Sequence, residues 1–124
     1  MELKFYRCNH CGNIVTFAKS SGVPVMCCGE KMQELNANTT DASAEKHVPV
    51  YSVENGVVTV RVGSAPHPMA DVHYIEWVAL QTKSGFQLKY LNPGDAPEAV
   101  FALASGDELE AVYAYCNLHG LWKA

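Results

Sequence analysis

Hydrophobic and polar residues alternate along much of the chain after residue 47, which is the pattern of half-buried β-strands. Residues 48–53 and 57–62 are rich in valine, and Asn55 and Gly56 lie between them. Asparagine and glycine both tolerate the positive φ that a tight hairpin turn requires. This segment therefore predicts a β-hairpin.

Further strands are predicted toward the C-terminus. Residues 72–82 are typical of a long, largely buried strand, whereas the alternation in residues 86–90 predicts a half-buried one. A last strand is expected over residues 108–115, ending directly at Cys116, and residues 92–95 and 105–107 have the composition of turns. Residues 96–104 come nearest to a helix, although Pro97 and the short length leave this segment ambiguous. Short strands with frequent turns predict a mostly β protein built on a β-sandwich.

The N-terminal part of the chain departs from this pattern. Residues 1–36 contain four of the five cysteines, and the polar stretch that follows, up to residue 45, is predicted to be a linker. We therefore expect two domains, residues 1–36 and residues 37–124. The first is too short to bury enough surface to fold unaided, so a bound metal is expected to stabilise it.

Composition and charge limit the possible partners and surroundings. The 124-residue chain has 48% hydrophobic and 18% charged residues and a formal net charge of −4. This balance is typical of a soluble globular protein and argues against a general nucleic-acid binder. No apolar run approaches the roughly 20 residues of a membrane span, and the first residues do not resemble a signal peptide. We expect a cytoplasmic protein with no membrane partner, whose clustered thiols are reduced and available to metal.

Four cysteines form the first candidate metal site: Cys8, Cys11, Cys27 and Cys28. A glycine directly follows each pair, where a sharp turn and a positive φ are expected. Paired cysteines of this kind more often hold structural zinc, but the adjacent pair Cys27–Cys28 predicts a distorted tetrahedron and leaves iron open. A disulfide is disfavoured by the expected compartment. His10, between two of the cysteines, is expected to be a solvated loop residue rather than a ligand.

The remaining cysteine and four of the five histidines form the second candidate site: His47, His67, His73, Cys116 and His119. All lie at expected strand ends or in loops, His47 and His73 at the starts of strands. Two prolines flank His67 and stiffen its backbone, and the spacing of Cys116 and His119 lets both reach one ion. A lone histidine is more often an ordinary core or surface residue, so spacing alone leaves a shared site open. If shared, four imidazoles and a thiolate suit five-coordinate iron, whose positive charge would attract an anionic substrate.

Six short segments resemble those of one known family in their order and spacing: CNHCG (8–12), CCG (27–29), EKHVP (45–49), HPM (67–69), HYI (73–75) and CNLHG (116–120). The chain resembles a desulfoferrodoxin, the two-iron class of superoxide reductase, over nearly its whole length. The first two segments resemble the desulforedoxin-like four-cysteine iron module, and the others resemble the ligand segments of the catalytic domain.

This resemblance implies a fold, a ligand set and an activity. Residues 1–36 would form the desulforedoxin-like module, and residues 37–124 an immunoglobulin-like β-sandwich. The catalytic iron would have four histidine ligands with Cys116 as the axial thiolate, so that each chain holds two iron ions. Glu45 would bind the oxidised iron, and Lys46 would assist reduction of superoxide to hydrogen peroxide. A homodimer and a rubredoxin-like electron donor are also implied.

Two other functions fit the same residues. The chain could be a non-enzymatic binding module whose four cysteines hold zinc, or an electron carrier that uses both irons without turning over a substrate. Metal content and colour separate the first from the enzyme, and oxidation of the reduced protein by superoxide separates the second.

Overall fold

The computed structural model describes residues 2–124. The chain divides into two compact units, Met1–Asn36 and Ala37–Ala124. No helix among the described residues is long and apolar enough to cross a membrane.

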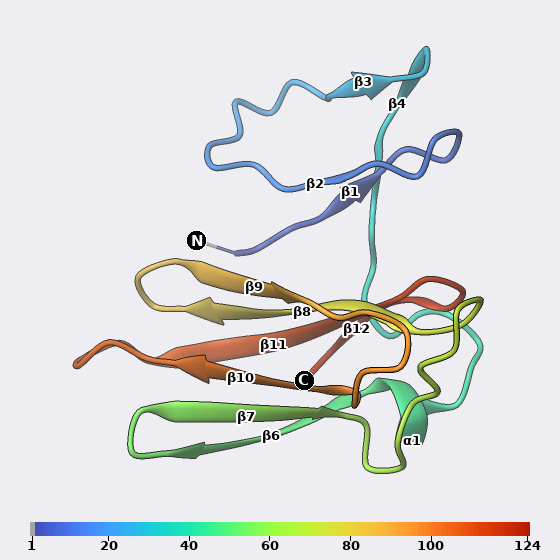
Figure 1. Ribbon diagram of the computed structural model, residues 1–124. Helices are drawn as coiled ribbons and strands as arrows, with labels where there is room; N and C mark the ends of the chain where they lie inside the picture. Colours follow the sequence, from blue (N-terminus) through green and yellow to red (C-terminus); the bar gives the residue numbers. More distant parts are fainter. Residues whose placement is uncertain (1) are drawn as a thin grey trace. The chain divides into compact units, whose positions relative to one another are not determined.

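The N-terminal unit is built from very short strands (Figure 1). They are β1 (Tyr6–Arg7), β2 (Ile14–Val15), β3 (Met26–Cys27), β4 (Glu30–Lys31) and β5 (Gln33–Glu34). One sheet has the order β2–β1–β5, and β3 pairs with β4 in a second. Strands of two residues bury little by themselves, so this unit depends on what holds its turns together.

The cysteines lie in the turns of this unit or, for Cys27, at the strand end beside a turn. Between β1 and β2, the Cys8 carbonyl accepts the Gly12 N–H at 3.0 Å, and Gly12 has a φ of 82°. Between β3 and β4, Cys28 and Gly29 have φ of 52° and 76°, as a type I′ hairpin turn requires. The expected positive φ after each cysteine pair is confirmed.

The C-terminal unit is an antiparallel sandwich of two sheets, drawn as two layers in Figure 1. One sheet has the order β10–β7–β6, with β6 (Pro49–Glu54), β7 (Val57–Val62) and β10 (Glu98–Ala102). The other has the order β12–β11–β8–β9, with β8 (Ile75–Thr82), β9 (Phe86–Tyr90), β11 (Leu109–Cys116) and β12 (Gly120–Lys123). This arrangement of three strands facing four is immunoglobulin-like, as expected.

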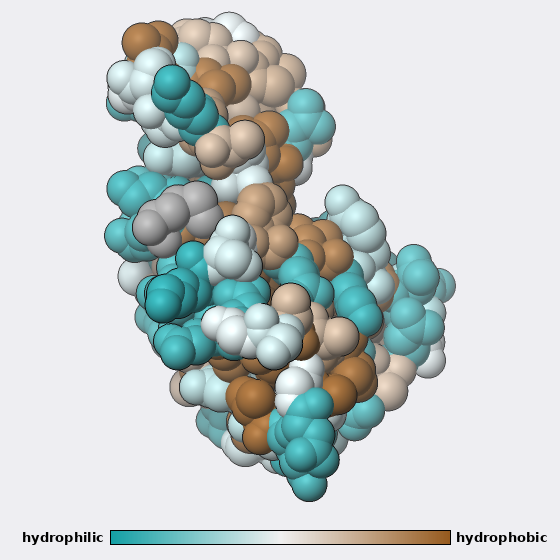
Figure 2. All heavy atoms as spheres, turned by 90° about the vertical axis from the view of Figure 1, so that its left-hand side faces the viewer, coloured by the Kyte–Doolittle hydropathy of each residue, from teal (hydrophilic) through white to brown (hydrophobic). Residues whose placement is uncertain are grey.

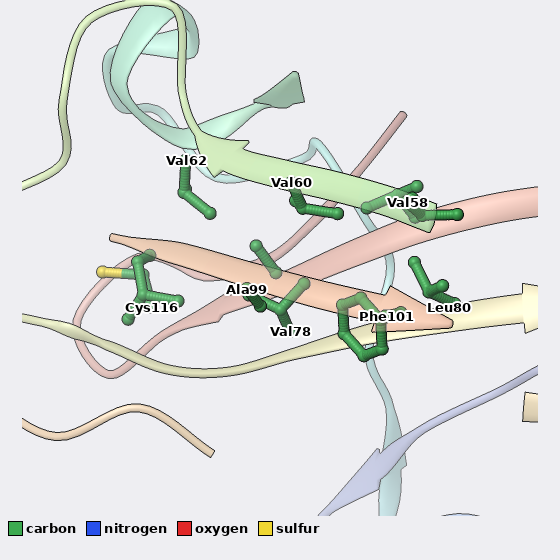
Figure 3. Packing of buried hydrophobic residues seen from close by; sticks show 11 residues of the cluster. Val58, Val60, Val62, Val78, Leu80, Ala99, Phe101 and Cys116 are labelled. Atoms are coloured by element: carbon green, nitrogen blue, oxygen red, sulfur yellow. The ribbon is translucent and has the colours of Figure 1, made fainter. Parts of the chain in front are cut away.

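The core of the sandwich follows from the period of two along its strands. Val58, Val60 and Val62 of β7 are fully buried and face alternate residues of β8 and β11 (Figure 3). Cys116 is the last core-facing residue of β11 and lies at one end of this cluster. The end of β11 therefore delivers a thiol to the edge of a dry, close-packed interior.

The strand predictions are mostly confirmed. The hairpin β6–β7, the buried strand β8, the strand β9 and the strand β11 all form. Phe86 and Tyr90 at the two ends of β9 are 42% and 78% exposed, so that strand is less covered than expected. The end of the sandwich that carries the β6–β7 and β8–β9 turns faces the viewer in Figure 2, where hydrophobic and hydrophilic residues are interspersed.

Residues 98–102, within the segment that the sequence left ambiguous, form strand β10, because pairing with β7 buries Ala99 and Phe101. Two other local predictions are wrong. Strand β12 follows the strand expected to be last. The expected linker ends in a helical turn, α1 (Ala44–His47), so His47 ends a helix instead of beginning a strand.

Candidate metal centres

The four cysteine sulfurs of the N-terminal unit converge on one point. The ligand atoms of Cys8, Cys11, Cys27 and Cys28 all lie within 4.8 Å of one another. The Cys11 and Cys27 sulfurs are 3.6 Å apart, close to the edge of about 3.8 Å of a tetrahedron with metal–sulfur bonds of about 2.3 Å. This separation is far longer than a disulfide bond, and all the cysteines are free.

The electrostatics of this group call for a cation. Backbone N–H groups of Cys11 and His10 lower the pKa of Cys8 to about 6. Hydrogen bonds with the Cys11 and Cys8 thiols raise the pKa of Cys28 to about 12. Without metal, ionisation of one thiol opposes ionisation of the next, so a bound cation is needed to make all four thiolates.

His10 lies beside this group without joining it. Its Nε2 forms an exposed ion pair with Glu30 at 3.1 Å, which links the β1–β2 turn to β4. The expectation of a solvated loop residue is confirmed, since about half of the His10 side chain, 53%, is exposed.

Four imidazoles form a closed ring at one end of the sandwich. Going round it, the neighbouring rings are His47–His67, His67–His73, His73–His119 and His119–His47, with centroids 4.6, 4.7, 5.1 and 5.0 Å apart. Each ring is nearly perpendicular to its neighbours, at 76°, 82°, 81° and 84°. The diagonal pair His47–His73 is 6.4 Å apart. Four imidazoles in such a square would be able to bind one metal ion between them.

Two backbone carbonyls fix which nitrogens point inward. Nδ1 of His47 lies 2.7 Å from the Ser43 carbonyl, and Nδ1 of His67 lies 2.6 Å from the Pro68 carbonyl. Each Nδ1 must therefore carry the proton, which leaves lone pairs on both Nε2 atoms. These Nε2 atoms are 3.1 Å apart. Two lone pairs at this distance repel unless a cation lies between them, and nitrogens sharing one ion at a right angle are about 3 Å apart.

The other imidazoles support the same conclusion. Among the described residues, His73 Nε2 is a buried atom with no hydrogen-bond partner. His119 faces the ring with Nδ1, which is 3.1 Å from His47 Nε2. Burial lowers the pKa of His67 to about 4 and also lowers the pKa values of His47 and His73. These imidazoles are therefore neutral at pH 7, the form that binds metal.

The fifth donor is the Cys116 thiol, which is fully buried. Its Sγ lies within 4.8 Å of the ligand atoms of His47, His67 and His73, and 3.8 Å from His119 Nδ1. A bulge in the β11–β8 ladder between Tyr115 and Cys116 adjusts the direction of this side chain. Burial raises the pKa of Cys116, and the His119 N–H donates to the sulfur at 3.3 Å. A buried thiolate needs a nearby positive charge, which a metal ion supplies.

Asn117 links the loop that carries His73 to the end of β11 that carries Cys116. Its side chain donates to the Val72 carbonyl at 3.1 Å and accepts the Tyr74 N–H at 3.0 Å. His73 lies between these two residues and outside strand β8, contrary to the expectation that it begins that strand. No role was predicted for Asn117, although asparagine side chains next to a strand end often form hydrogen bonds that fix a loop.

The loop after β7 anchors the helical turn α1. The Glu45 carbonyl accepts the Ala65 N–H at 2.9 Å and the Ser64 hydroxyl at 3.2 Å. Gly63 packs so closely that an added Cβ would lie 2.7 Å from the same carbonyl oxygen. Only glycine fits there, so the backbone that carries Glu45, Lys46 and His47 rests directly on the loop after β7.

Glu45 and Lys46 project from this turn into solvent, next to the buried His47. The backbone N–H of Glu45 lowers the pKa of its own carboxyl. The Lys46 charge contributes to lowering the pKa values of both His47 and His73. Its electrostatic field therefore reaches the ring of imidazoles.

Comparison with known proteins identifies the family. A family model described as desulfoferrodoxin matches residues 39–124, and one described as the desulfoferrodoxin N-terminal domain matches residues 1–35. The chain belongs to the desulfoferrodoxin family. Its four-cysteine group and its histidine–cysteine group match the two iron centres of desulfoferrodoxins.

Individual relatives agree with this family assignment. The desulfoferrodoxin of Syntrophotalea carbinolica is 45% identical over 123 residues, which are 99% of this chain and 96% of that protein. The crystal structure of the superoxide reductase from Treponema pallidum has a TM-score of 0.84 and 40% identity, covering 100% of this chain and 99% of that one. The superoxide reductase (1Fe-SOR) from Giardia intestinalis has a TM-score of 0.55 and 33% identity, covering 64% of this chain and 95% of that one.

Proposed function

We propose that this desulfoferrodoxin is a superoxide reductase that converts superoxide to hydrogen peroxide. The observation that carries the proposal is the ring of four imidazoles with a buried thiol beside it, in a chain similar over its full length to the superoxide reductase of Treponema pallidum. The reaction adds one electron and two protons to each superoxide. When bound, iron supplies that electron.

The proposed ligands are divided between the two units. Cys8, Cys11, Cys27 and Cys28 hold the first iron in a desulforedoxin-like domain, residues 1–36. The second iron is held in the catalytic sandwich domain, residues 37–124, by the five remaining donors: His47, His67, His73, His119 and Cys116. The convergence of each set supports this division, including His119, whose Nδ1 contacts both His47 and the thiol.

Lys46 is proposed to attract the superoxide anion and to order the water that delivers protons. Its charge already acts on His47 and His73, and it is exposed at the site. Lys46→Met should slow the reaction with superoxide and weaken its dependence on ionic strength. Lys83→Met, in the β8–β9 turn at the other end of the sandwich, makes the same change in net charge and should have no comparable effect. Equal rates in both variants would refute the steering role.

Glu45 is proposed to approach the oxidised iron, because it precedes Lys46 on the anchored helical turn. Glu45→Ala should leave the first reaction with superoxide fast and change the visible spectrum of the ferric protein. The control is Glu54→Ala on the β6–β7 hairpin. A ferric spectrum identical to that of the unmodified chain would remove Glu45 from this role.

The activity itself is tested by adding superoxide to the reduced protein. We expect oxidation of the second iron, one hydrogen peroxide per electron and no stoichiometric release of oxygen. Iron near two per chain is expected from metal analysis. A colourless zinc protein would support the binding-module alternative, and a coloured protein that superoxide fails to oxidise would support the electron carrier.

A homodimer is proposed on the evidence of strand β6. Tyr51 and Val53 share the core-facing side of their sheet with Val60 and Val58, yet they are 46% and 51% exposed while those valines are fully buried. A second copy of the chain would cover this edge. The mass in solution should be that of a dimer, and Val53→Lys should shift it toward the monomer. A monomer at all concentrations would exclude the proposal.

A rubredoxin-like iron protein is proposed as electron donor, and the cytoplasm as the location, because the four-cysteine centre needs reduced thiols. Reduced rubredoxin should re-reduce the ferric protein rapidly and with saturation. Recovery of the native chain from an exported fraction would contradict the proposed location.

A further inference from the structure

We propose that Trp122 is a positioning residue that holds His47 and His119 in the geometry of the second iron centre. The inference rests on the proposed function, in which both imidazoles are iron ligands. Trp122 lies on β12, pairs with Ala114 of β11 and is only 3% exposed. It is therefore fixed by the same sheet that delivers Cys116.

The indole ring covers one face of His47. The two rings are stacked, with centroids 4.8 Å apart and an interplanar angle of 29°. The His47 edge is already held by the Ser43 carbonyl at Nδ1. The carbonyl fixes the edge and the indole fixes the plane, so His47 has no freedom to rotate away from the position where its Nε2 meets those of its neighbours.

The same indole also holds the backbone of His119. Its Nε1–H donates to the His119 carbonyl at 3.1 Å. His119 lies in the turn between β11 and β12, and its Nδ1 is 3.1 Å from His47 Nε2. One rigid side chain thus contacts two adjacent members of the imidazole ring, one through its face and the other through its peptide group.

This arrangement has a chemical consequence for the metal centre. An imidazole bound to iron becomes more positive, and the electron-rich face of an indole stabilises positive charge stacked on it. The indole of Trp122 also keeps water away from His47, which is 2% exposed. Groups that contact and orient the metal ligands without binding the metal tune both its affinity and its electronic state.

Two variants of Trp122 separate the two contacts. Trp122→Phe keeps an aromatic ring against His47 and loses the N–H donor, and Trp122→Leu loses both. Trp77→Phe is the matched control, because Trp77 is also buried and stacked, on Tyr115 at 5.3 Å, but faces the other side of its sheet. The four-cysteine centre of each variant is an internal reference.

The measurements are the release of the second iron to a chelator, the visible spectrum of the ferric protein and its reduction potential. We expect looser binding of that iron in both Trp122 variants, by about 10-fold to 100-fold and more in Leu than in Phe. The visible spectrum and the reduction potential of the second centre should also shift. All three measurements should be unchanged in Trp77→Phe, and the first iron should be unaffected in every variant. If Trp122→Leu does not fold, Trp122→Phe decides the outcome.

Unchanged iron release, spectrum and potential in Trp122→Phe would overturn the inference, as would an equal change in Trp77→Phe. Neither result would affect the proposed function. That function fails separately, if the unmodified iron-loaded chain does not form peroxide from superoxide.

Discussion

The two metal centres of this chain differ in how much buried core surrounds their ligands. The cysteines of the N-terminal unit lie in turns between strands of two residues or, for Cys27, at the end of such a strand, and Cys11 and Cys28 are exposed. The histidines and Cys116 lie at the end of a sandwich whose valine-rich core is fully buried. In the first unit the metal must hold the fold together, whereas in the second the fold holds the ligands ready for the metal.

Removing the metal is the strongest way to break this comparison. Because metal binding supplies folding free energy to a unit with so little core, the iron-free chain should lose the structure of residues 2–36 and keep the sandwich. Amide hydrogen exchange on the metal-free chain measures both parts at once. Persistent protection in the N-terminal unit would show that the two centres do not differ in this way.

Single ligand substitutions sharpen the same contrast. Cys28→Ser should remove the first iron and leave peroxide production intact, because the second centre takes all its donors from residues after 46. Cys116→Ser should abolish peroxide production and leave the first iron in place. Iron analysis and the superoxide assay on both variants test this pair. Loss of peroxide production in Cys28→Ser would mean that the first centre is required for turnover.

The pH dependence of the metal-free sandwich gives a smaller effect. Burial holds the pKa of folded His67 at about 4, below the value of about 6.5 in an unfolded chain. Below pH 6.5 the unfolded state therefore takes up a proton that the folded state does not, so stability should fall as pH falls and level off below about pH 4. Denaturant unfolding of the metal-free chain between pH 7 and 5 measures the slope. His67→Gln should reduce this dependence of stability on pH. An unchanged slope would contradict the lowered pKa of folded His67.

Asn117→Ala should destabilise the sandwich by about 1–3 kcal/mol, because two backbone groups lose their side-chain partner. It should also loosen the second iron, since Asn117 joins the loop that carries His73 to the end of β11 that carries Cys116. Asn38→Ala is the control: its side chain also makes two hydrogen bonds to backbone, both to Lys123. Equal iron release from the two variants would show that Asn117 supports the fold and not the site.

The smallest effect is expected at His10. The exposed His10–Glu30 ion pair should contribute less than about 1 kcal/mol to the N-terminal unit, because solvent screens it. Denaturant unfolding of iron-loaded His10→Ala measures this contribution. A large loss of stability would mean that the surface pair, rather than the metal, holds the unit together.

The sequence alone determined most strands of the sandwich and the donor residues of both metal centres. Alternating valines predicted the β6–β7 hairpin, because alternation with a period of two is typical of a half-buried strand. The cysteine and histidine segments contained all the donor residues that come together in the structure. The local sequence pattern did not predict β10 and β12, which form by pairing with other strands. It also did not predict the helical turn that carries His47.

The tertiary structure decided what surrounds the donors. The ring order of the imidazoles, the Asn117 bridge and the stacking of Trp122 on His47 all join residues far apart in the sequence. No local period records such contacts, because each depends on which side of which sheet two distant segments meet. The chain specifies its metal ligands by composition and spacing, and the packed sandwich specifies how they point.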